Sequence, residues 1–147
     1  MLRALSFVCA LSLAACVTSG GDGPTSMATV TASDGGAMVE IEVSYTPIDD
    51  DSVRIRFALR PIGMDEMDKL ALNVVPGDFN VVEGSVQWSG YVAPRETQVH
   101  ELVLERREDT DPLRASFTLV RFADSGVLAG QDLEFTAGPK GLTALSR

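Results

Sequence analysis

VEIEVSYTPIDDDSVRIRFALR, residues 39–60, is the stretch from which the fold of this chain can be read. Apolar and polar side chains alternate strictly over residues 39–45, and the alternation returns over residues 53–60. A period of two is typical of a β-strand that buries one of its faces. Pro and Asp between the two runs are turn formers, so the stretch predicts a β-hairpin with its turn at residues 46–52.

Pairing the two strands across this turn sets Tyr45 opposite Val53. On the other face, the same register places Glu42 across from Arg56, and such a cross-strand charge pair contributes about 0.2–1 kcal/mol. One face of the hairpin is then apolar and the other is charged. This division favours an antiparallel sheet with one face in water.

The alternation continues along the rest of the chain, with turn signals between the apolar runs. No stretch shows an amphipathic helical period of useful length. Short strands separated by turns are typical of a β-sandwich or a β-barrel. The chain is therefore predicted to be all-β, with about seven to nine antiparallel strands. Beyond the hairpin, strands are predicted at residues 70–74, 79–83, 85–92, 97–106, 113–122 and 133–135.

One segment resembles a family of β-sandwiches. Residues 84–90, Gly-Ser-Val-Gln-Trp-Ser-Gly, followed by paired strands, look like part of a bacterial immunoglobulin-like domain. The resemblance implies an immunoglobulin-like sandwich with one aromatic side chain in mid-core. By the two-residue period, Trp88 should be buried against Phe57 and Phe117, whereas Tyr91 should face the other way. Tyr91 is therefore the candidate interface residue, since Tyr is enriched at protein contacts.

The N-terminus has the features of an export signal. Arg3 precedes an apolar run, residues 4–13, that is too short to span a membrane and that ends in Leu13-Ala14-Ala15-Cys16. This tetrapeptide resembles the lipobox of bacterial prolipoproteins. The resemblance implies that residues 1–15 are removed and that Cys16 carries diacylglycerol as a thioether, with a further fatty acid such as palmitate on its amine. An ordinary secretory signal beside a free cysteine is the alternative.

The chain thus divides into a lipoprotein signal peptide (residues 1–15), a lipidated flexible linker (residues 16–26) and a β-sandwich domain (residues 27–147). Gly, Ser, Thr and Pro dominate the linker, as in flexible tethers. In the lipoprotein family, an Asp directly after the lipidated cysteine retains the protein at the inner membrane. Because Val17 stands at that position, the resemblance implies the outer membrane, on its periplasmic or its surface side.

Composition limits the partners of the domain. The formal net charge is −9, and an acidic surface disfavours nucleic acids and anionic lipid head groups. The only cysteines are Cys9, in the signal, and Cys16. The domain is therefore expected to fold without a disulfide, although its compartment would permit one, and packing must supply its stability.

The chain offers little that could carry catalysis or hold a metal. His100 is its single histidine, and a catalytic triad or a zinc site needs more partners, so we interpret it as a half-exposed strand residue. Two acidic clusters, residues 49–51 and 65–68, could offer oxygen ligands to Ca²⁺, but neither has the spacing of a calcium-binding loop. No catalytic, metal-binding or cofactor-binding residue is assigned, and no cofactor is expected.

These features predict a lipid-anchored envelope lipoprotein that acts as a non-catalytic binding or accessory module. Its expected partners are the membrane, through the lipid on Cys16, and an envelope protein. The alternative is a small periplasmic hydrolase or a Ca²⁺-dependent binding protein. That alternative would be supported by a convergence of acids from distant loops, for example of Asp49 or Asp51 with Asp109 or Asp111. A carrier of an apolar ligand is a third hypothesis, and it requires an interior cavity.

Overall fold

The computed structural model describes residues 24–34, 37–62, 66–123 and 125–145, and over these ranges its regular secondary structure is entirely β. The predicted signal peptide and Cys16 lie outside the described residues, and the first strand begins inside the range assigned to the linker. No helix among the described residues is long and apolar enough to cross a membrane.

The ten strands of this part of the chain are β1 (Thr25–Asp34), β2 (Ala37–Pro47), β3 (Ser52–Pro61), β4 (Asp68–Val75), β5 (Phe79–Gly84), β6 (Gln87–Val92), β7 (Gln98–Arg106), β8 (Leu113–Arg121), β9 (Val127–Gly138) and β10 (Gly141–Ala144).

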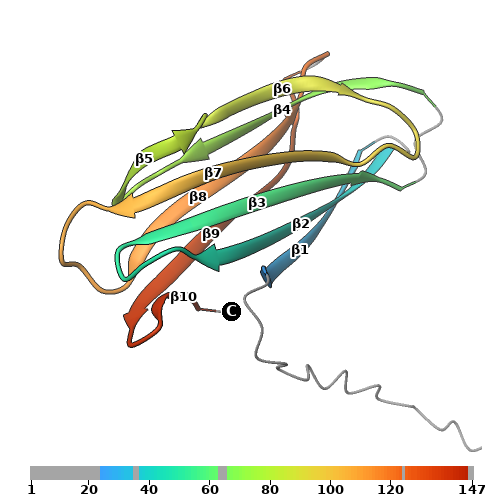
Figure 1. The fold of residues 1–147 in the computed structure, drawn as a ribbon. Helices are drawn as coiled ribbons and strands as arrows, with labels where there is room; N and C mark the ends of the chain where they lie inside the picture. Colours follow the sequence, from blue (N-terminus) through green and yellow to red (C-terminus); the bar gives the residue numbers. More distant parts are fainter. Residues whose placement is uncertain (1–23, 35–36, 63–65, 124, 146–147) are drawn as a thin grey trace, which may run out of the picture.

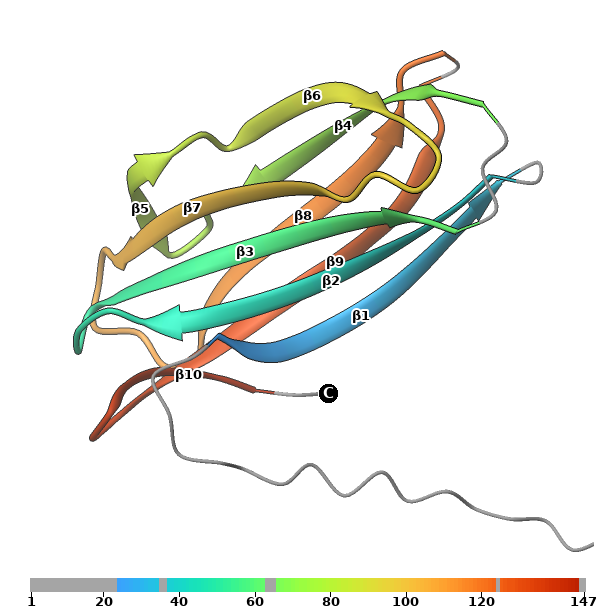
Figure 2. The ribbon, with the colours of Figure 1, turned by 45° about the vertical axis from the view of Figure 1, so that its right-hand side comes forward.

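The strands form two antiparallel sheets that pack face to face (Figures 1 and 2). Sheet A has the order β1-β2-β3-β7-β5, and sheet B has the order β10-β9-β8-β4-β6. Strands β2, β3, β7 and β5 are arranged like A, B, E and D of an immunoglobulin constant-type domain, and β4, β8 and β9 like C, F and G. The predicted all-β, antiparallel sandwich is therefore confirmed. Strands β1, β6 and β10 extend the sheets at their edges and bring the strand number above the predicted range.

The core lies between the two sheets and is built from the inward faces of their strands. Phe57 of sheet A and Phe117 of sheet B meet edge to face, with ring centroids 5.3 Å apart. A second aromatic group joins Phe135 to Phe79 at 5.7 Å and to Tyr45 at 6.0 Å. Edge-to-face pairs stabilise a core beyond the apolar area that each ring buries, so these five rings hold the two sheets together.

Trp88 does not occupy the middle of this core. It points inward from β6, opposite Leu72 of β4, but β6 is an edge strand and Trp88 is only half-buried. Its ring lies over Gly90, where an added Cβ would come within 2.8 Å of the indole. The predicted inward direction is confirmed, whereas the predicted full burial against Phe57 and Phe117 is wrong. The period of a strand gives its inner face, but not its place in the sheet.

The hairpin of β2 and β3 closes with a tighter turn than the one predicted. The turn runs only from Ile48 to Ser52. The Ile48 amide donates a 2.9 Å hydrogen bond to the Ser52 carbonyl oxygen. The register is therefore shifted by two residues, and Glu42 faces Ala58 instead of the predicted Arg56. A shift of two leaves every side chain on its predicted face.

The outer face of sheet A carries the charged surface that the alternation predicted, with different partners. Arg60 reaches Glu40 at 3.3 Å and Glu42 at 3.0 Å, and Arg56 lies 3.6 Å from Glu101. Exposed ion pairs of this kind contribute only about 0–1 kcal/mol each. Their main consequence is that this face is polar and well solvated.

Asp49 shapes the turn between β2 and β3. Its carboxylate accepts a 2.9 Å hydrogen bond from the Asp51 amide, the local bond that makes Asp a frequent turn residue. This bond, together with a hydrogen bond from the Ser52 hydroxyl, lowers the pKa of Asp49 below its ordinary value. The cause is that both donors stabilise the ionised carboxylate.

We expect Asp49→Asn to flatten the acid limb of the stability–pH curve. A carboxyl group whose pKa is lower in the folded chain contributes stability above its unfolded pKa, and this contribution is lost as the pH falls through the folded pKa. Melting temperatures measured from neutral pH into the acid range should therefore converge for wild type and variant. Asp50→Asn is the matched control in the same turn. A difference that stays constant with pH would contradict the assignment.

The two ends of the sandwich are distinguished by where the chain enters. Thr25 pairs with Tyr45, so β1 starts at the end that holds the β2–β3 turn. This end, termed the entry end, also holds β10 (Figures 1 and 2). The opposite end, termed the far end, carries the β6–β7 and β8–β9 connections. The 11 residues of β2, at about 3.3 Å each, separate the two ends by about 36 Å.

Candidate interaction surface

Tyr91 lies on the outer face of sheet B, near the far end. It is 63% exposed, whereas the neighbouring Val92 is fully buried. The two-residue period of β6 puts Tyr91 and Trp88 on opposite faces, so the predicted exposure of Tyr91 is confirmed. Whether Tyr91 is an interface residue depends on what surrounds it.

Lys69 and Phe122 lie beside Tyr91 on the same face. Lys69 pairs with Tyr91 across β4 and β6, and the Phe122 amide donates a 2.9 Å hydrogen bond to the Lys69 carbonyl. The Lys69 Nζ atom lies 4.1 Å from the Phe122 ring centroid and 6.0 Å from that of Tyr91, within the range of a cation–π contact. The three residues, termed the ring row, place one cation between two exposed rings.

Further exposed apolar side chains surround the ring row. Phe122 is 54% exposed, Met67 directly before β4 is 60% exposed, and Val127 at the start of β9 is 68% exposed. Val127 pairs with Val120 of β8, two residues before Phe122. Met67, Tyr91, Phe122 and Val127 are together termed the far-end patch. Several exposed large apolar side chains at one end of a sheet are typical of an interaction site.

Sequence reasoning named Tyr91 but missed Phe122 and Lys69. A signal for Phe122 was present, because Phe117 and Leu119 alternate inward and place residue 122 on the outer face. No signal indicated that Lys69 stands between the two rings. That position follows from the sheet order β8-β4-β6.

Two shallow hollows lie on the same face, toward the entry end. One, of about 330 Å³, is bordered by Val75, Arg114 and Glu134. The other, of about 320 Å³, runs along β8 and β9, where Gly130 opposite Thr118 leaves the surface open. Both hollows are lined by Ser116 and Asp132, so this carboxylate lies between them.

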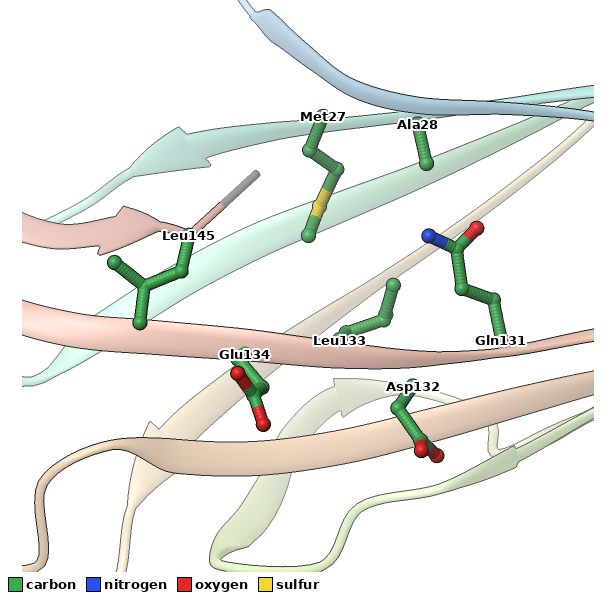
Figure 3. A pocket seen from close by; sticks show the side chains of 7 residues that line it. All are labelled: Met27, Ala28, Gln131, Asp132, Leu133, Glu134 and Leu145. Atoms are coloured by element: carbon green, nitrogen blue, oxygen red, sulfur yellow. The ribbon is translucent and has the colours of Figure 1, made fainter. Parts of the chain in front are cut away.

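The interior gap between β1 and β9 is small (Figure 3). Met27 and Ala28 face Gln131 and Leu133 across it, and its volume is about 30 Å³. Ligand pockets measure about 300–1,000 Å³. The gap is therefore too small for an acyl chain or a comparable apolar ligand, and it gives the carrier hypothesis no site.

The acidic loops are engaged by arginines. The Arg106 guanidinium bridges the carboxylates of Asp51 and Asp109, the latter at 2.9 Å, and Arg121 lies 2.8 Å from Asp68. Asp51 and Asp109, whose convergence would support the hydrolase alternative, thus lie close together, but around a cation of the protein itself. Over the described ranges, no group of three or more His, Cys, Asp or Glu side chains could hold a metal ion. Asp65, part of the second acidic cluster, lies outside those ranges.

His100 has a structural position. It is half-exposed in β7, as predicted, and its Nε2 atom lies 2.7 Å from the Ser85 carbonyl oxygen. The ring nitrogen donates this bond, since the carbonyl can only accept. Ser85 follows Gly84, whose φ of +84° turns the chain from sheet A into sheet B. The single imidazole thus holds the point where the chain changes sheets.

No family model matches this chain, and no curated protein matches it. What the protein does is therefore inferred from its exposed surfaces. The outer face of sheet A is a solvated array of ion pairs. The outer face of sheet B, with its far-end patch and two hollows, is the candidate interaction surface.

Proposed function

We propose that this protein is a lipid-anchored, non-catalytic binding module of the bacterial envelope that contacts another protein through the outer face of sheet B. The observation that carries the proposal is the far-end patch, where Tyr91 and Phe122 stand exposed on either side of Lys69. The lipobox-like segment ending in Cys16 supports the anchor and the outer-membrane location.

The position of the far-end patch supports a protein partner rather than the bilayer. An anchor at Cys16 attaches to the domain through β1, at the entry end. The patch lies at the other end, about 36 Å away by the length of a strand. The net charge of −9 further opposes contact with anionic lipid and with nucleic acids.

The arrangement of titratable groups supports a binding role over catalysis. His100 bonds to a backbone carbonyl, and the carboxylates of Asp51 and Asp109 are bridged by Arg106. A general acid–base pair needs groups that can reach a bound substrate and exchange a proton with it. The exposed Tyr91, Phe122 and Met67 side chains are instead typical of protein interfaces, where Tyr, Phe and Met are enriched.

A photocrosslinking amino acid placed at Tyr91 tests the proposal in living cells. We expect it to trap a protein in the envelope after irradiation, because the Tyr91 side chain lies within the proposed contact. The matched control is the same substitution at Val99, which is 44% exposed on the outer face of sheet A. Equal trapping from both positions, or no product from position 91, would contradict the proposed surface.

A further inference from the structure

We propose that the outer face of sheet B is self-complementary and that its partner is a second copy of this chain. This inference rests on the proposed function, in which sheet B is the contact surface, and it names the occupant. The face carries a projecting feature at its far end and a matching hollow feature toward its entry end. A surface with both features can pair with itself around a two-fold axis.

The projecting feature is the ring row. Tyr91 and Phe122 project from the sheet on either side of the Lys69 side chain. Over the part of the chain that the structure describes, the Lys69 ammonium has no carboxylate within ion-pair distance. The row therefore has the order ring, cation, ring, and among the described residues the cation contacts the rings and no carboxylate.

The receiving feature consists of the two hollows. Asp132 lies between them, because its side chain lines both. The Asp132 carboxylate likewise has no cationic partner among the described residues, since the nearby Arg114 bonds to Glu134 at 3.2 Å. This part of the face thus has the order hollow, unpaired carboxylate, hollow.

Turning a second copy about a two-fold axis that lies in the interface brings these features together. Ser116 of β8 and Phe122, directly after the end of that strand, are six residues apart, about 20 Å, and the axis would pass between them. Lys69 of each copy then meets Asp132 of the other, and the two rings enter the two hollows. Because the contact is isologous, every favourable pair forms twice.

The size of the face sets the expected strength of this contact. Four strands at about 4.8 Å spacing and about 20–25 Å of strand length cover roughly 400–500 Å² per copy. The total of about 800–1,000 Å² lies below the roughly 1,200–2,000 Å² of standard interfaces and in the range of weak, transient contacts, so a dimer with a dissociation constant in the micromolar range or weaker is expected.

Analytical ultracentrifugation tests the inference on the chain from Val17 onward, which contains all ten strands and lacks the lipid site. We expect reversible dimerisation, weakened at least about tenfold by Lys69→Asp and by Asp132→Lys, a factor that corresponds to about 1.4 kcal/mol. The doubly substituted chain restores opposite charges across the interface. Its dimerisation should return to within about threefold of wild type.

Phe122→Ser should also weaken the dimer, whereas Val99→Ser on sheet A is the matched control that should not. Circular dichroism melting of each variant establishes that it is folded.

A chain that stays monomeric up to its solubility limit would overturn the inference. A dimer whose dissociation constant is unchanged by all sheet B variants would overturn it as well. Failure of the double variant to recover would overturn the Lys69–Asp132 pairing. If the chain is monomeric while position 91 traps a different protein, the proposed function stands and the second copy is wrong.

Discussion

Replacing Phe117 with alanine is expected to lower the free energy of unfolding by about 4 kcal/mol. Phe117 is 1% exposed in the middle of β8, and its ring meets Phe57 of the opposite sheet at 5.3 Å. Truncation removes the apolar contacts of the ring and leaves a cavity between the sheets that their backbones cannot close. Since small domains have a net stability of about 5–15 kcal/mol, this loss is a large part of the total. Urea denaturation followed by circular dichroism measures it.

Trp88→Ala is the informative comparison, because Trp is larger but lies at the sheet edge. Its half-buried ring should contribute about 2 kcal/mol, near half of the cost for a fully buried aromatic. Phe117→Leu is the conservative control and should cost less than about 1.5 kcal/mol, since much of the volume stays filled. A greater loss of stability from Trp88→Ala than from Phe117→Ala would contradict the placement of both rings.

The burial of Phe117 could be predicted from the alternation along its strand, whereas the half-exposure of Trp88 could not. Alternation along one strand separates the inner face from the outer face, and that separation is correct for β2, β3, β7 and β8. The order of strands in a sheet arises from contacts between distant segments. The predicted inward direction of Trp88 is therefore correct, whereas its predicted full burial is wrong, because β6 is an edge strand.

The length of the turn between β2 and β3 is a second feature that could not be predicted from the sequence. The Pro and Asp residues between β2 and β3 indicate a turn, but not its length. Pro47 continues β2, and Asp49 bonds to the Asp51 amide within a shorter turn. The hairpin register therefore differs by two residues from the predicted one. At the C-terminal side, Gly141–Ala144 shows too little alternation to be predicted as a strand, yet it pairs with β9.

The candidate surface was predictable only in part, for the same reason. Exposure of Tyr91 follows from the period of β6. The ring row requires β4 to lie between β6 and β8, and the hollows require Gly130 to face Thr118. Both features depend on which strands pair, and the period of a single strand does not give this.

The acidic loops could also be predicted only in part. Asp51 and Asp109 lie close together, as the alternative hypothesis proposed, but Arg106 lies between them.

Replacing Cys16 with alanine is expected to remove the proposed lipid anchor and to transfer the protein from the membrane fraction to the soluble fraction. The thiol of Cys16 is the group that would carry the diacylglycerol thioether, and alanine has no atom that can form this bond. Each buried methylene contributes about 0.8 kcal/mol, so several acyl chains hold a protein on a bilayer almost permanently. Without them, a domain with a net charge of −9 has no reason to stay at an anionic surface.

Cys9→Ala is the matched control, because it removes the other cysteine of the chain and should leave both lipidation and membrane partition unchanged. Mass spectrometry of the N-terminal peptide should find Cys16 as the first residue, with the mass of the acyl groups, in wild type and in Cys9→Ala. An uncleaved signal could by itself retain Cys16→Ala at the membrane. The decisive comparison therefore places this variant behind an ordinary secretory signal that is cleaved directly before residue 16. If that protein still partitions fully with membranes, or if the wild-type peptide carries no acyl mass, the anchor is not a lipid on Cys16.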